Sequence, residues 1–554
     1  MTNKQIARQL KLTADLIEVT GGNPFRARAF ASGARAVERL ETPIESHVAD
    51  GTVTDVPGIG KGLAKDLSEL VATGAMQATE TLLEALPPGL PEVLRVKGLG
   101  VKKVRVLWTE AGVTSLDALE HAAASGQLAA LDGFGAKSVE NILAGVAQLR
   151  AYRGKAHLRD AMPDALAVRD ALRGAGFDAD LAGPVRRQCN VVDRIDVVVQ
   201  ATADAAMGAL QALDARFDRT SDAITGTTAA GLPITVHPAP TAFGQTLWEV
   251  TGPDDHLAAV RARLPGEVPD SEAAIYEAAG LALIPPPLRD DPHWLDVAAA
   301  GPLPTLLTTA DLRGTVHNHT TASDGAHTLR EMCDAARARG LSYFGVCDHS
   351  RSLQIAHGLS VEALAEQRRD VDALNAAYAA EGVAFRVFAG SEVDILSDGA
   401  MDYPDDVLDG LDLVVASVHT GFSMTEDEAT ARVVRAVSHP SVDVLGHPTG
   451  RLLLRREGYP LDHATVLDAC AEHGVAVELN ANPWRLDVDW RFVRAARERG
   501  VLVSINPDAH AVDGLDDVRW GVASAQKGGL TPEGSLTSLD ADGLEAWLRK
   551  RRAR

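Results

Sequence analysis

The chain has 554 residues, 46% of them hydrophobic, which is enough for roughly three or four domains with apolar cores. No apolar run is long enough to span a bilayer, and the first residues lack the apolar segment of a secretory signal, so we expect a protein that is neither membrane-embedded nor secreted. The formal net charge of −22 excludes a chain that is basic throughout and would coat nucleic acid.

The charge is unevenly distributed along the chain. Residues 1–160 contain 19 lysines and arginines against 18 acidic residues, whereas the remainder contains 35 against 58. Any contact with DNA is therefore expected in the first 160 residues, on local basic patches. Two such patches consist of Arg26, Arg28, Arg35 and Arg39, and of Arg95, Lys97, Lys102, Lys103 and Arg105. Solvated helix faces are the alternative interpretation of each patch.

Cysteine usage bears on the compartment in which the protein works. The four cysteines are Cys189, Cys333, Cys347 and Cys470. They form no CxxC pair, which indicates reduced, mostly buried thiols in a cytoplasmic protein.

Three segments in the N-terminal part share a glycine–apolar–glycine core with a lysine nearby. They are Pro57-Gly58-Ile59-Gly60-Lys61, Lys97-Gly98-Leu99-Gly100-Val101-Lys102 and Asp132-Gly133-Phe134-Gly135-Ala136-Lys137. The glycines allow a tight turn and point the N–H groups of the next helix toward a phosphate. One such unit is weak evidence because any helical hairpin can use glycine, but three of them resemble helix-hairpin-helix elements. The resemblance implies sequence-independent binding of the DNA backbone by the six glycines, with Lys61, Lys65, Lys102, Lys103 and Lys137 as further contacts.

In the last third of the chain, short apolar runs alternate with stretches of helical periodicity. We expect helices at 327–340, 361–382, 425–438, 463–474 and 488–500. This alternation indicates βα units and a mainly parallel sheet or barrel. Potential metal ligands stand at the ends of the apolar runs: His317, His319, Asp324, His349, Glu392, His419, His447, Asp508 and His510. Because chemistry collects at the C-terminal ends of barrel strands, these side chains predict one metal-binding pocket.

The ligand types predict both the metal and the chemistry. Mixed nitrogen and oxygen ligands suit Mn²⁺, Zn²⁺ or Fe²⁺ better than Mg²⁺ or Ca²⁺. Closely spaced ions lower the pKa of a bound water and neutralise the leaving oxygen, so we expect phosphoester hydrolysis. The motifs Val316-His317-Asn318-His319, Asp348-His349-Ser350, Ser417-Val418-His419 and Asp508-Ala509-His510 resemble the polymerase-and-histidinol-phosphatase (PHP) domain over about 311–554. That resemblance implies a distorted (βα)7 barrel that holds up to three divalent ions, with Mn²⁺ as the expected metal. It also implies that Glu392 bridges two of these ions.

Other motifs extend the resemblance toward the N-terminus. Residues 21–30 with the first hairpin are similar to the lyase domain of family X DNA polymerases, residues 183–187 and 194–199 to the palm, and residues 284–289 to the end of the thumb. The whole chain thus resembles a bacterial or archaeal family X polymerase with a C-terminal PHP nuclease. This implies a multidomain fold with a lyase-like helix-hairpin-helix domain (1–85), a fingers-like helix-hairpin-helix domain (86–155), a degenerate α/β nucleotidyltransferase-like palm (156–225), a thumb (226–295), a linker (296–310) and the PHP phosphoesterase barrel (311–554).

The polymerase site departs from the family pattern. Nucleotidyl transfer needs three carboxylates on the palm sheet, two of them as Asp-x-Asp on one strand, where residues two apart share a face. Here that pair is Arg194 and Asp196, the strand expected to carry the third acid has Thr235, and Pro184 replaces a serine that contacts triphosphate. Asp193 points to the opposite face unless a bulge intervenes. We therefore expect weak or absent polymerisation.

The lyase step is also in doubt. It requires a lysine amine for a Schiff base, but the hairpin register puts Asp66 at the nucleophile position. Lys65 is adjacent, yet one residue turns about 100° on a helix. Lys61 and Lys65 are expected to contact phosphate or solvent instead.

These observations predict a DNA-repair enzyme that acts as a metal-dependent 3′-5′ exonuclease on gapped, nicked or 3′-ended DNA. We expect it to be a monomer, with cleavage at abasic sites and cleaning of 3′ ends as further activities. Arg451 is a candidate for steadying the scissile phosphate, with a structural salt bridge as the equal alternative. Weaker candidates for substrate contact are Asn480, Asn482, Arg485 and Asp487. A small-molecule phosphatase of histidinol-phosphatase type, an active gap-filling polymerase and a non-enzymatic DNA scaffold remain as alternatives.

Overall fold

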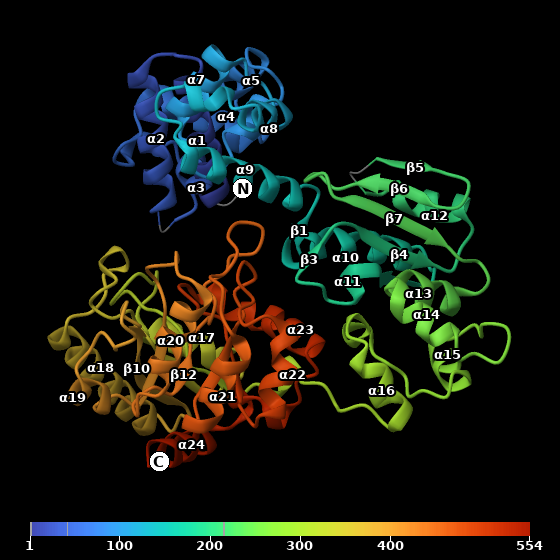
Figure 1. The fold of residues 1–554 in the computed structure, drawn as a ribbon, viewed down its shortest axis with the longest axis vertical. Coiled ribbons are helices and arrows are strands. Elements are labelled where there is room, and N and C mark those ends of the chain that lie inside the picture. Colours follow the sequence, from blue (N-terminus) through green and yellow to red (C-terminus); the bar gives the residue numbers. More distant parts are fainter. Residues whose placement is uncertain (1–2, 41, 214–215, 554) are drawn as a thin grey trace. The chain divides into compact units, whose positions relative to one another are not determined.

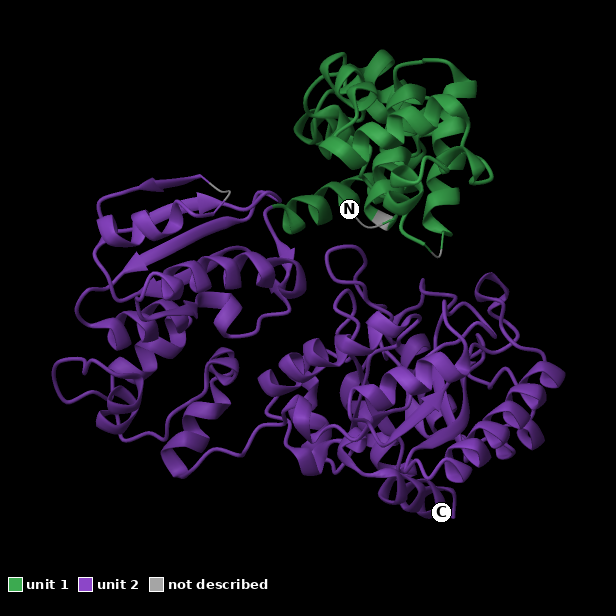
Figure 2. Cartoon of the chain, turned by 180° about the vertical axis from the view of Figure 1, so that it is seen from behind, with its two compact units in different colours: residues 1–153 green, residues 154–554 purple. Residues whose placement is uncertain are grey.

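The structure is a computed structural model that describes residues 3–40, 42–213 and 216–553. It divides into two compact units, residues 1–153 and residues 154–554 (Figure 2). Among the described residues, none of the helices combines the length and the apolar character needed to cross a lipid bilayer.

The first unit is helical throughout its described residues. Its helices are α1 (Asn3–Val19), α2 (Pro24–Glu38), α3 (Ile44–Ala49), α4 (Lys61–Thr73), α5 (Gln77–Glu84), α6 (Leu90–Val93), α7 (Val101–Ala111), α8 (Leu116–Ala124) and α9 (Ala136–Tyr152). They enclose two hydrophobic cores, one built from residues 6–76 and the other mainly from residues 86–146. Helix α1 belongs to both cores, because Leu10 lies in the first and Leu16 in the second.

The second unit begins with an α/β layer. Its elements are β1 (Ala156–His157), α10 (Leu158–Gly174), β2 (Ala179–Ala182), α11 (Gly183–Arg186), β3 (Val191–Val192), β4 (Ile195–Val199), α12 (Ala203–Leu210), β5 (Phe217–Arg219), β6 (Ile224–Thr227) and β7 (Pro233–Pro238). The main sheet has the order β2-β4-β7-β6-β5 and is antiparallel except for the β4–β7 pair. Successive side chains of β4 point to opposite faces, so Val197 packs with α10 and Val198 with the next helical region.

That helical region comprises α13 (Phe243–Thr251), α14 (Asp254–Arg261), α15 (Glu272–Ala278) and α16 (His293–Ala300). Its core contains Trp248, Tyr276 and Trp294. Two expected domain boundaries fall inside elements of the structure: β6 runs across residues 225 and 226, and α16 runs across residues 295 and 296. Both β6 and β7 are hydrogen-bonded into the five-stranded sheet, which extends to Pro238.

The remainder forms a barrel of seven parallel strands with helices around it (Figure 1). The strands are β8 (Gly314–Thr315), β9 (Tyr343–Val346), β10 (Arg386–Asp394), β11 (Leu413–Ser417), β12 (Val444–Leu445), β13 (Ala476–Asn480) and β14 (Val503–Asn506). The helices are α17 (Leu329–Ala338), α18 (Val361–Ala380), α19 (Asp405–Asp409), α20 (Glu426–Val437), α21 (His463–His473), α22 (Trp490–Glu498), α23 (Val518–Lys527) and α24 (Ala541–Arg552). All five helices expected from the periodicity are present, and the expected barrel is confirmed.

The barrel closes between its first and last strands without a regular ladder. The Val316 amide donates to Oδ1 of Asn506 at 2.9 Å, and the His319 amide donates to the Ala509 carbonyl at 2.9 Å. An isolated parallel bridge joins Asn318 to Ala509. Because a side-chain amide replaces part of the ladder, the first and last strands stay in register and bring their C-terminal ends together.

Candidate metal centre, palm site and hairpins

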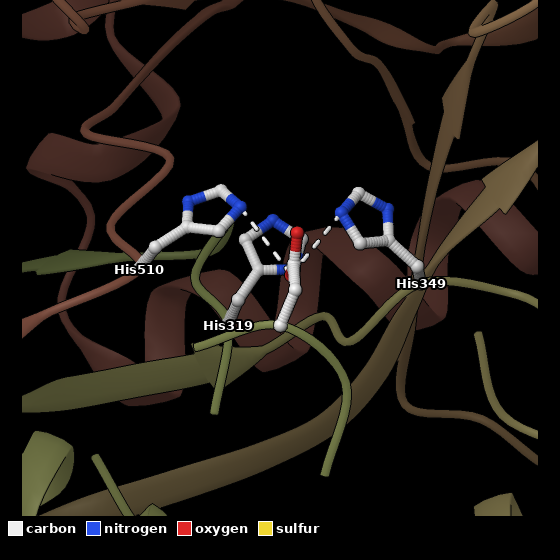
Figure 3. Close-up of side chains that lie close together, drawn as sticks. His319, His349 and His510 are labelled. Atoms are coloured by element: carbon white, nitrogen blue, oxygen red, sulfur yellow. Dashed lines mark ion pairs between the residues drawn. The ribbon is translucent and has the colours of Figure 1, made fainter. Parts of the chain in front are cut away.

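The nine predicted ligands converge at the C-terminal rim of the barrel. Eight of them fall into three overlapping groups, in each of which the ligand atoms lie within 4.8 Å of one another. The groups are His319, Asp324, His349 and His510; His317, His319 and Asp508; and His349, Glu392 and His419. The ninth residue, His447, places Nε2 2.9 Å from Oε1 of Glu392. Figure 3 shows the rings of His319, His349 and His510 close together, contributed by segments far apart in sequence.

Glu392 lies at the centre of this cluster. It is part of β10 rather than following the strand, and it is 1% exposed. Its Oε2 lies 2.8 Å from Nδ1 of His349 and 3.4 Å from Nε2 of His317. Its Oε1 lies 2.9 Å from Nε2 of His447 and 3.2 Å from Nε2 of His419. One carboxylate therefore faces two sets of ring nitrogens, which is the arrangement needed to bridge two ions.

Several buried polar atoms of the cluster lack a hydrogen-bond partner within the described chain. They are both carboxylate oxygens of Glu392, Nε2 of His317, Nδ1 of His319 and of His349, and both ring nitrogens of His447. Burying so many polar atoms without partners is costly unless they are held for another ligand. Imidazole and carboxylate ligands suit divalent transition-metal ions, so these residues fit the divalent metal ions that the sequence predicts.

Protonation in the cluster favours metal binding at some ligands and links it to proton release at others. Burial alone raises the pKa of Glu392, but His419, His317 and His349 lower it well below its ordinary value. Burial, together with neighbouring histidines, lowers the pKa of His319 to about 3, so this ring is neutral at pH 7. Burial opposes charge on His419, but Glu392 and Asp394 raise the pKa of His419 to about 10. A cation binding at His419 must therefore displace a proton.

The sequence analysis did not identify Glu478, which organises this cluster from β13. It is fully buried, and Oε1 accepts from Nδ1 of His317 at 2.7 Å and from Nδ2 of Asn506 at 3.0 Å. Oε2 accepts from the amide of His447 at 2.7 Å and from Nδ2 of Asn480 at 3.3 Å. The available signal was a single acid inside the apolar run Ala476-Val477-Glu478-Leu479.

Two further carboxylates orient the ligands without joining them. Asp394 accepts from Nδ1 of His419, which leaves Nε2 of that ring turned to Glu392. Asp348 follows β9, but it accepts from the Thr320 amide at 2.8 Å and the Thr320 hydroxyl at 2.6 Å. Such hydrogen bonds fix the orientation of metal ligands and of the loops that carry them.

Arg451 forms a salt bridge, which was the structural alternative to a contact with the scissile phosphate. Its Nε donates to the Arg485 carbonyl at 3.0 Å, Nη2 donates to the Leu486 carbonyl, and Nη1 pairs with Asp489. The guanidinium is thus engaged in holding the loop after β13. In that loop Arg485 reaches the cluster, with Nε 3.8 Å from Oδ2 of Asp508.

The other candidates, Asn480 at the end of β13 and Asn482 and Asp487 in the loop after it, belong to the framework of that loop. Asn480 donates to Oδ2 of Asp508 at 3.0 Å, so it supports a predicted metal ligand. Asp487 accepts from the amide and the hydroxyl of Thr449 at 3.0 and 2.9 Å. Oδ1 of Asn482 accepts from the Trp484 amide at 3.1 Å. These contacts explain how the loop is held but leave Arg485 as its candidate for contact with substrate.

On the sheet predicted to be a polymerase palm, Asp196 is the acid of the expected pair, and its carboxylate is already paired. It is 3% exposed; Oδ2 accepts from Nε of Arg194 at 2.8 Å, and Oδ1 lies 3.0 Å from Nε2 of His237. Thr235 stands opposite Asp196 in the β4–β7 register, and Pro184 lies in the short helix α11. The Arg194 guanidinium is therefore hydrogen-bonded to Oδ2 of Asp196, an oxygen that a metal ion would need as a ligand.

The three hairpins share one backbone conformation. Gly58, Gly98 and Gly133 have φ of +94°, +87° and +82°. Gly60, Gly100 and Gly135 are the extended N-cap residues of α4, α7 and α9, and none of the three caps makes a side-chain hydrogen bond. The apolar residue between each pair of glycines is buried. The repeat read from the sequence thus positions three uncapped helix N-termini alike.

The hairpin lysines differ in their surroundings. Lys61, Lys65 and Lys102 are exposed, and Lys137 is also exposed but pairs with Glu140 at 2.9 Å. Lys103 donates to Ser138 at 3.3 Å and lies 5.3 Å from the ring centre of Phe134. Burial raises the pKa of Asp66, while Arg26 opposes this rise.

Comparison with known proteins matches three parts of the chain to family models. A helix-hairpin-helix domain model matches residues 1–76, a SAM-like helix-hairpin-helix tandem matches 90–147, and the PHP domain matches 315–482. The DNA polymerase/3′-5′ exonuclease PolX of Bacillus subtilis (strain 168) is 33% identical over 579 residues, covering 99% of this chain and 100% of the relative. A probable phosphatase of Thermoanaerobacter sp. (strain X514) is 26% identical over 251 residues, covering 43% of this chain and 94% of the relative.

Helix-hairpin-helix repeats, an α/β palm-like sheet and a PHP barrel with clustered ligands define a multidomain DNA-processing enzyme with a metal-dependent hydrolase domain. The phosphatase relatives account for less than half of the chain, whereas the PolX relative accounts for nearly all of it. The chain belongs to the family of the DNA polymerase/3′-5′ exonuclease PolX.

Proposed function

We propose that this chain is a DNA-repair enzyme that degrades DNA from its 3′ end at the barrel rim and has little or no polymerase activity. The observation that carries the proposal is the convergence of nine ligands around Glu392, whose two oxygens face separate sets of ring nitrogens. Full-length similarity to a polymerase/exonuclease supports DNA rather than a small phosphoester as substrate.

The residues of the rim have distinct roles in this proposal. His317, His319, Asp324, His349, Glu392, His419, His447, Asp508 and His510 hold up to three divalent ions, with Mn²⁺ as the preferred ion and Zn²⁺ or Fe²⁺ as alternatives. Bound ions supply a water of lowered pKa and neutralise charge on the phosphoryl oxygens. Glu478 and Asp394 keep His317 and His419 oriented toward Glu392. Arg485 supplies a positive charge beside Asp508 for the phosphate.

The hairpins are the proposed DNA anchor. Three uncapped helix N-termini in one repeated conformation, with exposed lysines beside them, suit contact with backbone phosphates and carry no base readout. Gapped or nicked DNA bound by a monomer is the proposed substrate, and cleavage at abasic sites and cleaning of blocked 3′ ends are proposed further activities of the same rim.

The exonuclease proposal is tested with purified protein, Mn²⁺ and a 3′-ended DNA. His349→Ala and Asp508→Ala are expected to lose most of the activity, because His349 belongs to two of the three ligand groups and Asp508 supplies the carboxylate of the remaining one. His473→Ala, on the outer helix α21, is the matched control and is expected to remain active. Full activity in both ligand variants would place the nuclease elsewhere.

A small-molecule phosphatase is the second candidate, favoured by the partial matches to probable phosphatases. A direct comparison separates the two: hydrolysis of a histidinol-phosphate-type monoester is measured beside degradation of a DNA 3′ end at equal phosphate concentration. Preference for the monoester, unaffected by removal of the hairpins, would favour the phosphatase.

A further inference from the structure

The loop between β9 and α18 exposes an isoleucine on the side of the barrel that carries the metal ligands. Ile355 is 90% exposed, the highest value among the large apolar side chains that the described residues expose. It stands in the 3-10 turn η5 (Gln354–Ala356), whereas its neighbour Ala356 is 6% exposed. Isolated exposed apolar residues are common, so what matters is how firmly Ile355 is held relative to the metal ligands.

Both ends of this loop are bonded to the backbone of predicted metal ligands. The Ser350 amide donates to the Glu392 carbonyl at 3.0 Å, and the Leu359 amide donates to the His349 carbonyl at 2.8 Å. The ends meet closely at Gly358, where an added Cβ would lie 1.9 Å from the Ser350 carbonyl oxygen. The base of the loop is therefore fixed to the metal centre itself.

The stem of the loop makes a second set of contacts with the site. The Ser352 hydroxyl donates to Asp394, the residue that also accepts from His419. The Ser352 amide donates to Asp402 at 2.8 Å, and Arg351 donates to the Asp402 carbonyl at 2.6 Å. The Arg351 side chain, about half exposed, also pairs with the Asp402 carboxylate at 3.4 Å, which ties the stem to the loop after β10 a second time.

The tip is organised by its own hydrogen bonds. The amides of Ala356 and Gly358 both donate to the Leu353 carbonyl, at 3.1 and 3.2 Å, and the Leu353 amide donates to the Ser350 carbonyl at 3.1 Å. Consecutive turns of this kind bury Ala356 and direct Ile355 outward. The loop thus holds the Ile355 side chain in an exposed position, where packing within the protein does not account for an apolar residue.

We propose that Ile355 is a specificity-determining residue that packs against the terminal base pair of a DNA duplex and parts its strands, so that the 3′ strand reaches the metal ligands. The inference rests on the proposed nuclease function. A nucleotide at a duplex end is stacked and paired, and its phosphate must leave the stack to enter a buried cluster of ligands. Proteins commonly separate base steps with an apolar wedge such as isoleucine, whose burial against the bases offsets the lost stacking.

The test uses the full-length protein and two DNAs with the same 3′ strand, one single-stranded and one a blunt duplex. Ile355→Ser is expected to lower the ratio of duplex to single-strand degradation rates about tenfold, equivalent to about 1.4 kcal/mol in activation free energy. Ile355→Leu, which keeps an apolar tip, is expected to retain the wild-type ratio. Leu283→Ser is the control, because Leu283 is 49% exposed and lies outside the barrel.

A second measurement reports strand separation directly. A duplex carries 2-aminopurine as the 3′-terminal base and phosphorothioate linkages that resist hydrolysis. Its fluorescence is expected to rise on binding wild-type protein and to stay quenched with Ile355→Ser. An unchanged rate ratio and an equal fluorescence rise in that variant would overturn the wedge, whereas wild-type protein inactive on both DNAs would overturn the nuclease proposal instead.

Discussion

Glu478→Gln tests how far the metal centre depends on a residue that coordinates no metal in our assignment. The carboxylate of Glu478 accepts four hydrogen bonds, from His317 and Asn506 at one oxygen and from His447 and Asn480 at the other. Glutamine keeps the shape but replaces one oxygen by an NH2 group. In either orientation that group faces two donors, because both oxygens are already used.

The Glu478→Gln substitution has two possible outcomes at these contacts. Either buried donors lose their acceptor, at about 1–3 kcal/mol for each unsatisfied group, or His317 shifts its proton to Nε2. Nε2 lies 3.4 Å from Glu392 and is the nitrogen that must coordinate, so its protonation blocks the ligand. Outer hydrogen-bond partners of metal ligands typically contribute about 10–100-fold in affinity, which corresponds to about 1.4–2.7 kcal/mol.

The assay is calorimetric titration of the purified protein with Mn²⁺, followed by exonuclease rates at low and saturating Mn²⁺. We expect Glu478→Gln to weaken Mn²⁺ binding about 10–100-fold and to recover part of its activity at high metal. Glu472→Gln makes the same chemical change at an exposed position on α21 and serves as the control. Metal affinity within twofold of wild type for Glu478→Gln would refute the role assigned to this residue.

Three further predictions address the other parts of the chain. Arg194→Asp, made together with His349→Ala to silence the nuclease, is expected to give no template-directed extension of a one-nucleotide gap, because the third acid is still missing at Thr235 and catalytic groups of this kind are non-additive; robust extension would mean that the palm was misinterpreted. Removal of residues 1–150 is expected to weaken DNA binding and flatten its dependence on salt, and an equal salt slope would remove the hairpins as anchor. Burial, with a contribution from nearby Arg289, lowers the pKa of His256 to about 4, so the unfolded chain binds this proton more tightly and stability is lost as pH falls from about 6.5 to about 4. Thermal unfolding of His256→Gln is expected to show about 3 kcal/mol less acid destabilisation over that range, and an unchanged pH profile would contradict this.

Features that depend on neighbouring residues were predictable from the sequence. Helical periodicity predicted α17, α18, α20, α21 and α22, since the apolar face of a helix repeats within a few residues. The glycine repeat predicted a common hairpin, and the three positive φ values agree with it. Ligands at the ends of apolar runs predicted the metal cluster, because parallel strands necessarily bring their C-terminal ends to one rim.

Features that depend on distant residues required the tertiary structure. Glu478 meets His317 across 161 residues, and Asn506 closes the barrel on Val316 across 190. Arg451 had equal prospects as a phosphate contact or a salt bridge until the loop after β13 brought Asp489 and two carbonyls to it. The sequence by itself determined which side chains stand at the strand ends, because a βα repeat sets their position through local geometry. Only the fold decided which of them face one another, because hydrogen-bond partners in a barrel are chosen by strand order and register rather than by distance along the chain.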